Sequence, residues 1–172
     1  MDRLLRMLRH RWFDERDARR AVSDEALARI EAQVADSERG HGGEIAVVVE
    51  GGLPLSYLWR GLSARDRAVM LFGKMRVWDT ERNNGVLIYL LLADQAIELV
   101  ADRGLNRCVS NADWKAMVAR MGQAFQAGQF EDGLTQALEE VSAVLVAHFP
   151  REDGEPLSGE RANELPDAPA LI

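Results

Sequence analysis

The sequence predicts an α/β fold: a three-layer α/β/α sandwich around a small mixed sheet, preceded by an amphipathic helix. Short apolar segments at 44–50, 85–93 and 96–101 have the composition of strands. Longer segments with apolar residues every three or four positions flank them, as amphipathic helices require. Only Asp94 and Gln95 join the last two strands, so these must run antiparallel and the sheet is mixed.

Length and composition indicate one self-sufficient domain. The chain has 172 residues, of which 47% are hydrophobic, enough to build a core. Its one cysteine, Cys108, permits no internal disulfide, and no secretory signal is present, so a cytoplasmic protein is expected. Because the sequence has no apolar run of about 20 residues, no transmembrane segment is expected. The net charge of −7 argues against nucleic-acid binding.

Residues 1–21 are predicted to form a basic amphipathic helix. Leu4, Leu5, Leu8 and Trp12 share one face, and the first 20 positions carry seven arginines against four acidic residues. Such a helix either packs back on its own domain or lies on an anionic membrane or a partner. If the helix lies on a membrane, the protein is expected to be peripheral to the inner face of that membrane.

The next two helices have clear start signals. Ser23 caps a helix that runs to about Glu38, and acidic residues follow it in the first turn. Ser63 caps another, with Asp66 three residues on as in a capping box. Between them, after the first strand, we expect a loop.

That loop carries two aromatic residues, Tyr57 and Trp59. Exposed aromatic side chains are common interface anchors, so both are candidate interaction residues. The alternative for Leu58 and Trp59 is a hydrophobic plug beneath the loop.

The remaining elements complete the domain organisation. Ser110 or Asn111 caps a long helix that Gly128 ends, and a last helix runs from about 130 to 148. Another short strand is expected around 105–109. After Pro150 the composition shifts to Gly, Pro and acidic residues without periodicity, which predicts a disordered acidic tail. The expected parts are therefore the helix at 1–21, the domain at 22–149 and the tail at 150–172.

Several kinds of catalytic machinery are absent from the sequence. It contains no P-loop, no G-x-G-x-x-G and no G-x-S-x-G elbow. A thiol phosphatase needs an arginine six residues after its cysteine, but Trp114 stands at that distance from Cys108. The three histidines are far apart in the sequence, so neither zinc nor haem is expected as a cofactor. Without a P-loop or G-x-G-x-x-G, no nucleotide cofactor is expected.

The remaining motifs follow one another in a characteristic order. They are a Ser-capped helix ending in Glu38, the strand EIAVVVE, Asn83-Asn84-Gly85 before the apolar strand, Asp102-Arg103-Gly104-Leu105 after the antiparallel strand, and Phe125, Gly128, Phe130 and Gly133. In this order they resemble the TPM domain family over residues 22–148. The chain is most similar to the short cytoplasmic branch, which lacks the signal peptide and membrane anchor of many relatives.

This resemblance implies an acidic site at the loop ends, associated in some members with divalent cations and acid phosphatase activity. It carries over Glu38 and Asn83 as ligands of Ca²⁺ or Mg²⁺, and Asp102, an acidic residue at the same strand ends, completes the expected set. Many relatives have Asp at the position of Asn83; an amide oxygen lacks the full charge on which hard cations depend, so the site would be weak.

Two functions remain open. A hydrolase would hold the metal with Glu38 and either Asp79 or Asp102. Arg82 or Arg103 would bind the phosphate oxygens. Other family members act as assembly or repair factors, and bacterial ones accompany membrane-associated proteins such as LemA. We favour a binding or assembly module with a weak divalent-cation site and a membrane-associated protein partner; the alternative is a metal-dependent acid phosphatase-like hydrolase.

Overall fold

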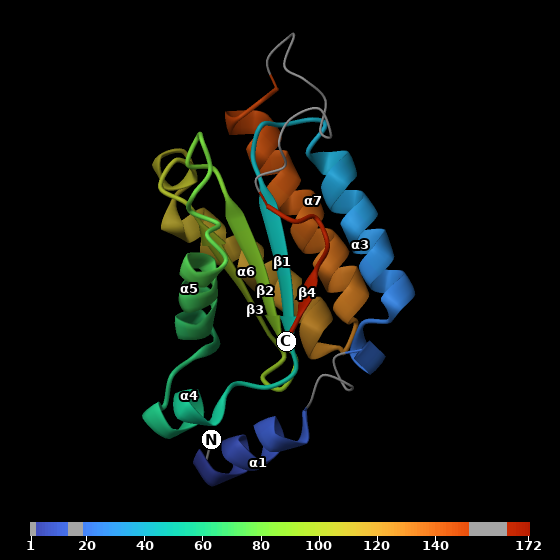
Figure 1. The fold of residues 1–172 in the computed structure, drawn as a ribbon, viewed down its shortest axis with the longest axis vertical. Helices are drawn as coiled ribbons and strands as arrows, with labels where there is room; N and C mark the ends of the chain where they lie inside the picture. Colours follow the sequence, from blue (N-terminus) through green and yellow to red (C-terminus); the bar gives the residue numbers. More distant parts are fainter. Residues whose placement is uncertain (1–2, 14–18, 152–164) are drawn as a thin grey trace.

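The computed structural model describes residues 3–13, 19–151 and 165–172, and it confirms the predicted α/β sandwich (Figure 1). The mixed sheet has the strand order β3-β2-β1-β4. β1 runs parallel to β2 and β4, and β2 is antiparallel to β3. The strands are β1 (Ile45–Glu50), β2 (Val86–Leu91), β3 (Ala96–Ala101) and β4 (Ala170–Leu171).

Helices cover both faces of the sheet (Figure 1). One face carries α3 (Asp24–Ser37), α6 (Asn111–Gln126) and α7 (Phe130–His148); the other carries α5 (Ala64–Lys74). Every residue of β1 and β2 is buried, as the apolar run at 85–93 predicts for a central strand. Alternate side chains of these strands enter the two cores, which fixes the register of the sheet.

The predicted helix starts are confirmed. The Ser23 side chain accepts a hydrogen bond from the backbone N–H of Ala26 (3.2 Å). Ser63 and Asp66 form a complete capping box at the start of α5. Gly128, with a φ of +76°, follows the end of α6.

Two predictions about local structure are wrong. Residues 105–109 contain a short 3₁₀ helix (Leu105–Arg107) instead of a strand, because the carbonyl of Asp102 accepts the N–H groups of Leu105 and Asn106. The expected loop after β1 contains the helix α4 (Leu55–Arg60), which ends at Gly61 in the left-handed conformation.

The chain ends also differ from prediction. The first helix, α1, spans Arg3–Trp12; residues 14–18 lie outside the described residues, and 19–21 are again helical. The expected disordered tail is wrong for residues 165–172, since β4 pairs with β1 there and Leu165 is buried. Residues 152–164 of that tail lie outside the described residues. None of the helices in the described ranges combines the length and apolarity that crossing a bilayer requires.

Candidate functional site

The sheet brings the predicted ligand residues to one end, which we call the loop edge. Because β1 and β2 run parallel, both begin at the end that is uppermost in Figure 1, and antiparallel β3 finishes there. Glu38 is the C-cap residue of α3, shortly before β1. Asn83 precedes β2, and Asp102 directly follows β3.

Glu38 is buried at the loop edge, with 8% of its surface exposed. Its Oε1 accepts a hydrogen bond from the backbone N–H of Ile45 (3.2 Å). Burial, together with the nearby carboxylates of Glu44 and Asp167, raises the pKa of Glu38 to about 8. Acidic groups from the end of α3, the start of β1 and the segment before β4 therefore meet here, and Glu38 is mostly protonated at neutral pH.

Asn83, Asp102 and Arg103 form a second group at the loop edge. Arg103 Nε donates a hydrogen bond to Asn83 Oδ1 (2.7 Å). Asp102 Oδ1 accepts the backbone N–H of Arg103 (2.6 Å), while its buried Oδ2 has no hydrogen-bond partner in the described part of the chain. The Arg103 guanidinium thus occupies Asn83 Oδ1, the amide oxygen that would otherwise coordinate a metal cation.

The other two predicted catalytic residues, Asp79 and Arg82, lie in the segment between α5 and β2. Asp79 is exposed and forms an ion pair with Arg76 (3.1 Å). Arg82 is partly buried in the turn before β2. A catalytic role for either residue stays a prediction.

The oxygen donors of the loop edge suit a hard cation, but they are not assembled as a metal centre. Carboxylate and amide oxygens are the ligands that Ca²⁺ and Mg²⁺ prefer. Within residues 3–13, 19–151 and 165–172, no group of three or more His, Cys, Asp or Glu side chains is arranged to hold a metal ion. Glu38 and Asp102 flank β1 and β3, with β2 between these strands. A cation bound at either group would therefore have few protein ligands.

A known protein family matches most of this chain, including most of the loop edge. The TPM domain family matches residues 16–144, a span that holds both groups of the loop edge except Asp167. The chain belongs to the TPM domain family.

Two solved structures share the TPM fold. The NMR structure of BA42 protein from the psychrophilic bacterium Bizionia argentinensis is 26% identical, with a TM-score of 0.72 over 88% of this chain and 95% of that chain. The N-terminal domain of a P. gingivalis protein is 19% identical, with a TM-score of 0.59 over 76% of this chain and 82% of that chain, and shows the fold alone. No curated protein matches the sequence.

Two buried polar side chains, those of Asn84 and His41, lie in the loops beside this edge, and neither was selected as a site residue from the sequence. Asn84 is fully buried, and its Nδ2 donates to the carbonyl of Gly42 (2.8 Å), which ties the loop before β1 to the start of β2. His41 is 2% exposed, and its Nδ1 lies 3.1 Å from the carbonyl oxygen of Gly43. Asn83-Asn84-Gly85 was selected as a motif before the apolar strand, with Asn83 alone as a candidate ligand. Nothing in the periodicity distinguishes a buried asparagine in a turn from an exposed one.

The predicted interaction residues lie at the opposite end of the TPM domain, on α4 (Figure 1). Trp59 is 76% exposed, whereas Leu58 is buried, so the plug interpretation applies to Leu58 alone. Tyr57 is partly buried, with the Arg67 guanidinium 5.3 Å from its ring centroid. Of the two aromatic residues, Trp59 is therefore the more accessible contact.

The raised pKa of Glu38 predicts that the protein loses stability above pH 6.5. The folded state keeps the Glu38 proton up to about pH 8, whereas the unfolded chain releases it near its ordinary value of 4.5. Stability from this group is therefore lost as the pH rises through that interval. Burial lowers the pKa of His41 to about 4, which acts in the opposite direction between pH 4 and 6.5, so the two effects largely cancel there.

Between pH 6.5 and 8 the Glu38 effect stands alone. We expect the free energy of unfolding, measured in urea, to fall by about 2 kcal/mol over this range. Glu38→Gln keeps an acceptor for Ile45 but cannot ionise, so it should flatten the profile. An equal fall in the Gln variant would show that Glu38 is not the group responsible.

Proposed function

We propose that this TPM domain is a binding and assembly module whose loop edge holds a weak divalent-cation site. The observation that carries the proposal is the cluster of carboxyl groups around buried Glu38, with Glu44 and Asp167 close enough to raise its pKa. Acidic groups held together in this way repel one another once ionised, and a bound cation would relieve that repulsion.

The Glu38 cluster is favoured over the Asn83–Asp102 group as the place where the cation binds. At the second group, the Arg103 side chain already supplies a cation to Asn83 Oδ1. At the first, two carboxylates would supply the charge on which affinity depends, with water completing the coordination of Ca²⁺ or Mg²⁺. Because Asp167 leads into β4, a cation there would also hold the C-terminal strand to the loop before β1.

Calcium is expected to stabilise the protein in a pH-dependent way. At a concentration about ten times the dissociation constant, binding to the folded state alone adds about 1.4 kcal/mol, or about 3 °C in Tm. The rise should be larger at pH 8.5 than at pH 6.5, because the cation competes with the Glu38 proton. Differential scanning fluorimetry with Ca²⁺, Mg²⁺ and Mn²⁺ measures it.

Four variants locate the effect. Glu38→Gln should abolish the rise, while Asp79→Asn, which removes an exposed carboxylate outside the cluster, should leave it intact. If Asp102→Asn instead abolished the Ca²⁺-dependent rise in Tm, the cation would be assigned to the group formed by Asn83, Asp102 and Arg103. An unchanged rise in Glu38→Gln/Asp102→Asn would place it away from both groups.

The same proteins decide between binding and hydrolysis. With p-nitrophenyl phosphate at acidic and neutral pH, we expect no metal-dependent turnover above that of Glu38→Gln/Asp102→Asn. Turnover that requires the metal and disappears in the double variant would replace the proposed binding role with that of a phosphatase-like hydrolase.

A further inference from the structure

The helix α1 packs on the domain with its polar face, and its apolar face points away. Leu4, Leu5, Leu8 and Trp12 are 66%, 61%, 50% and 80% exposed. A surface helix of a globular protein normally does the reverse and buries its apolar stripe in the core. Sequence analysis left open whether this helix packs on its own domain or serves a partner; it does pack on the domain, but the face it leaves exposed is apolar.

A single carboxylate at the end of the sheet holds α1 in this orientation. Asp94, in the turn between β2 and β3, accepts hydrogen bonds from Arg6 (2.8 Å) and Arg9 and lies 3.0 Å from His10 Nε2. Although burial opposes ionisation, the bonds from His10 and Arg6 hold the pKa of Asp94 well below its usual range.

His10 adds a second attachment to the domain. Its ring is fully buried, and its Nδ1 accepts the backbone N–H of Leu53 (3.0 Å), so the ring proton is on Nε2 and faces Asp94. Gly52 lies directly against the helix, because a Cβ there would come within 2.5 Å of the carbonyl oxygen of His10. Several buried polar contacts therefore fix α1 with its leucines outward.

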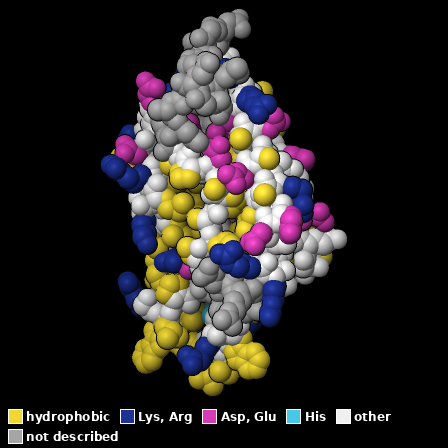
Figure 2. Space-filling model, turned by 45° about the vertical axis from the view of Figure 1, so that its right-hand side comes forward, with side chains coloured by type: hydrophobic (Ala, Val, Ile, Leu, Met, Phe, Trp, Pro, Cys, Tyr) yellow, Lys and Arg dark blue, Asp and Glu magenta, His cyan; other side chains and the backbone are white. Residues whose placement is uncertain are grey.

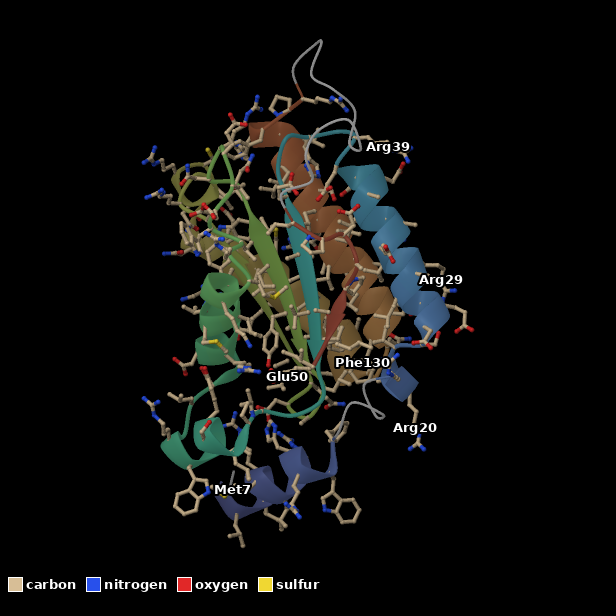
Figure 3. The ribbon with its side chains drawn as sticks, in the orientation of Figure 1. Met7, Arg20, Arg29, Arg39, Glu50 and Phe130 are labelled. Atoms are coloured by element: carbon tan, nitrogen blue, oxygen red, sulfur yellow. The ribbon has the colours of Figure 1, made fainter. Side chains whose placement is uncertain are left out.

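The neighbouring helix α4 extends the exposed apolar area. It contacts α1 and adds Leu55 and Trp59, which are 56% and 76% exposed. Figure 2 shows hydrophobic side chains gathered at the lower end of the molecule, where Figure 1 places both helices. In Figure 3 side chains of α1 and α4 project outward from this end. We call it the apolar end: Leu4, Leu5, Leu8, Trp12, Leu55 and Trp59.

The described residues of α1 and α4 carry a net positive charge, unlike the whole protein. Neither α1 nor α4 contains an acidic residue. Arg11 and Arg60 are exposed at this end, and Arg9 is partly exposed. The chain as a whole carries −7. Exposed leucines, two indoles and a basic rim are the composition of helices that lie in the interface of an anionic bilayer, where indole rings prefer the headgroup level.

We propose that the apolar end binds the surface of an anionic lipid bilayer, with α1 lying in the plane of the interface. The ten residues of α1 are too few to cross a bilayer, so binding is peripheral. The side chains project from one end of the molecule, a shape suited to insertion among headgroups. This proposal does not depend on the cation site, which is at the other end of the sheet.

Sedimentation of the full chain with vesicles tests the proposal. We expect binding to phosphatidylcholine vesicles that contain roughly one third phosphatidylserine, much weaker binding to phosphatidylcholine alone, and loss of binding as salt rises. The variant Leu8→Ser/Trp59→Ser should reduce the partition coefficient about tenfold or more. Trp78→Ser is the matched control, because Trp78 is 46% exposed in the segment before β2 and should bind like the wild type.

A charge pair separates electrostatic from apolar attraction. Arg11→Glu/Arg60→Glu should weaken binding to the anionic vesicles about tenfold and remove its salt dependence, whereas Arg39→Glu, near the loop edge, should change little (Figure 3). Because the side chains of Arg11, Arg39 and Arg60 are exposed, these charge variants should keep the wild-type Tm.

Three outcomes would overturn the proposal. The first is absence of binding to either vesicle. The second is binding to anionic vesicles that Leu8→Ser/Trp59→Ser leaves unchanged. The third is binding to native membranes that is lost after their proteins are digested, which would assign the apolar end to a protein partner instead.

Discussion

Replacing Glu50 with alanine is expected to lower the free energy of unfolding by about 3–5 kcal/mol. Glu50 ends β1 and is 3% exposed (Figure 3). Its carboxylate accepts hydrogen bonds from Arg67 Nε (2.9 and 3.1 Å), from Arg67 Nη2 (2.6 Å) and from the Tyr89 hydroxyl (2.6 Å). Removing the carboxylate leaves the Arg67 side chain, which is 13% exposed, without its counter-charge, and a buried phenol without its acceptor.

Two further variants separate the lost charge from the lost packing. Tyr89→Phe removes one hydrogen bond and should cost only about 1 kcal/mol. Glu50→Leu/Arg67→Met removes both charges, so it should be less destabilising than Glu50→Ala, since no buried charge is left alone. Urea unfolding at neutral pH gives all three values. A cost for Glu50→Ala no larger than that for Tyr89→Phe would contradict the expectation.

The second large effect is expected at Gly85, the last residue of the Asn83-Asn84-Gly85 turn. A Cβ at this position would lie 2.0 Å from the carbonyl oxygen of Val77 and 3.0 Å from its Cγ1. Val77 is fully buried, so its backbone has little room to move away. We expect Gly85→Ala to lower the free energy of unfolding by about 3 kcal/mol.

Gly122→Ala is the matched control for this substitution. Gly122 lies within α6, and nothing comes within 4 Å of a Cβ built there. Alanine should therefore stabilise the helix by about 0.5–1 kcal/mol. If Gly85→Ala and Gly122→Ala gave similar stabilities in urea, the close approach of Val77 would not explain the glycine.

The elements that sequence analysis predicted well are those with local signals. Ser23 and Ser63 form their cap bonds with groups three residues away, and Asp94-Gln95 is too short to join anything but antiparallel strands. β2 was recognisable because a strand buried on both faces has no polar alternation. In each case the information lies within a few consecutive residues.

The errors at α1 and at the C-terminal strand involve contacts across long stretches of sequence. The hydrophobic pattern located the apolar face of α1 but not its direction, which depends on Asp94, more than 80 residues away. β4 pairs through only two residues, too few for a strand pattern. At the loop edge, Asn83 and Arg103 were both selected and do form a hydrogen bond. The approach of Asp167 to Glu38 depends on β4 and could not be predicted from either residue's neighbours.

The position of β4 gives the molecule a mechanical connection between its two ends. The strand follows Asp167 near the loop edge and runs parallel to β1. At its far end, the N–H of Gly51 donates to the carbonyl of Ile172 (3.1 Å), next to the Gly52–Leu53 segment that contacts α1. A displacement of β4 at the loop edge would therefore disturb its hydrogen bonds with β1 as far as the end of the sheet that lies near α1. A cation that secures β4 at the loop edge would therefore also favour its pairing with β1, which ends beside the surface on which α1 rests.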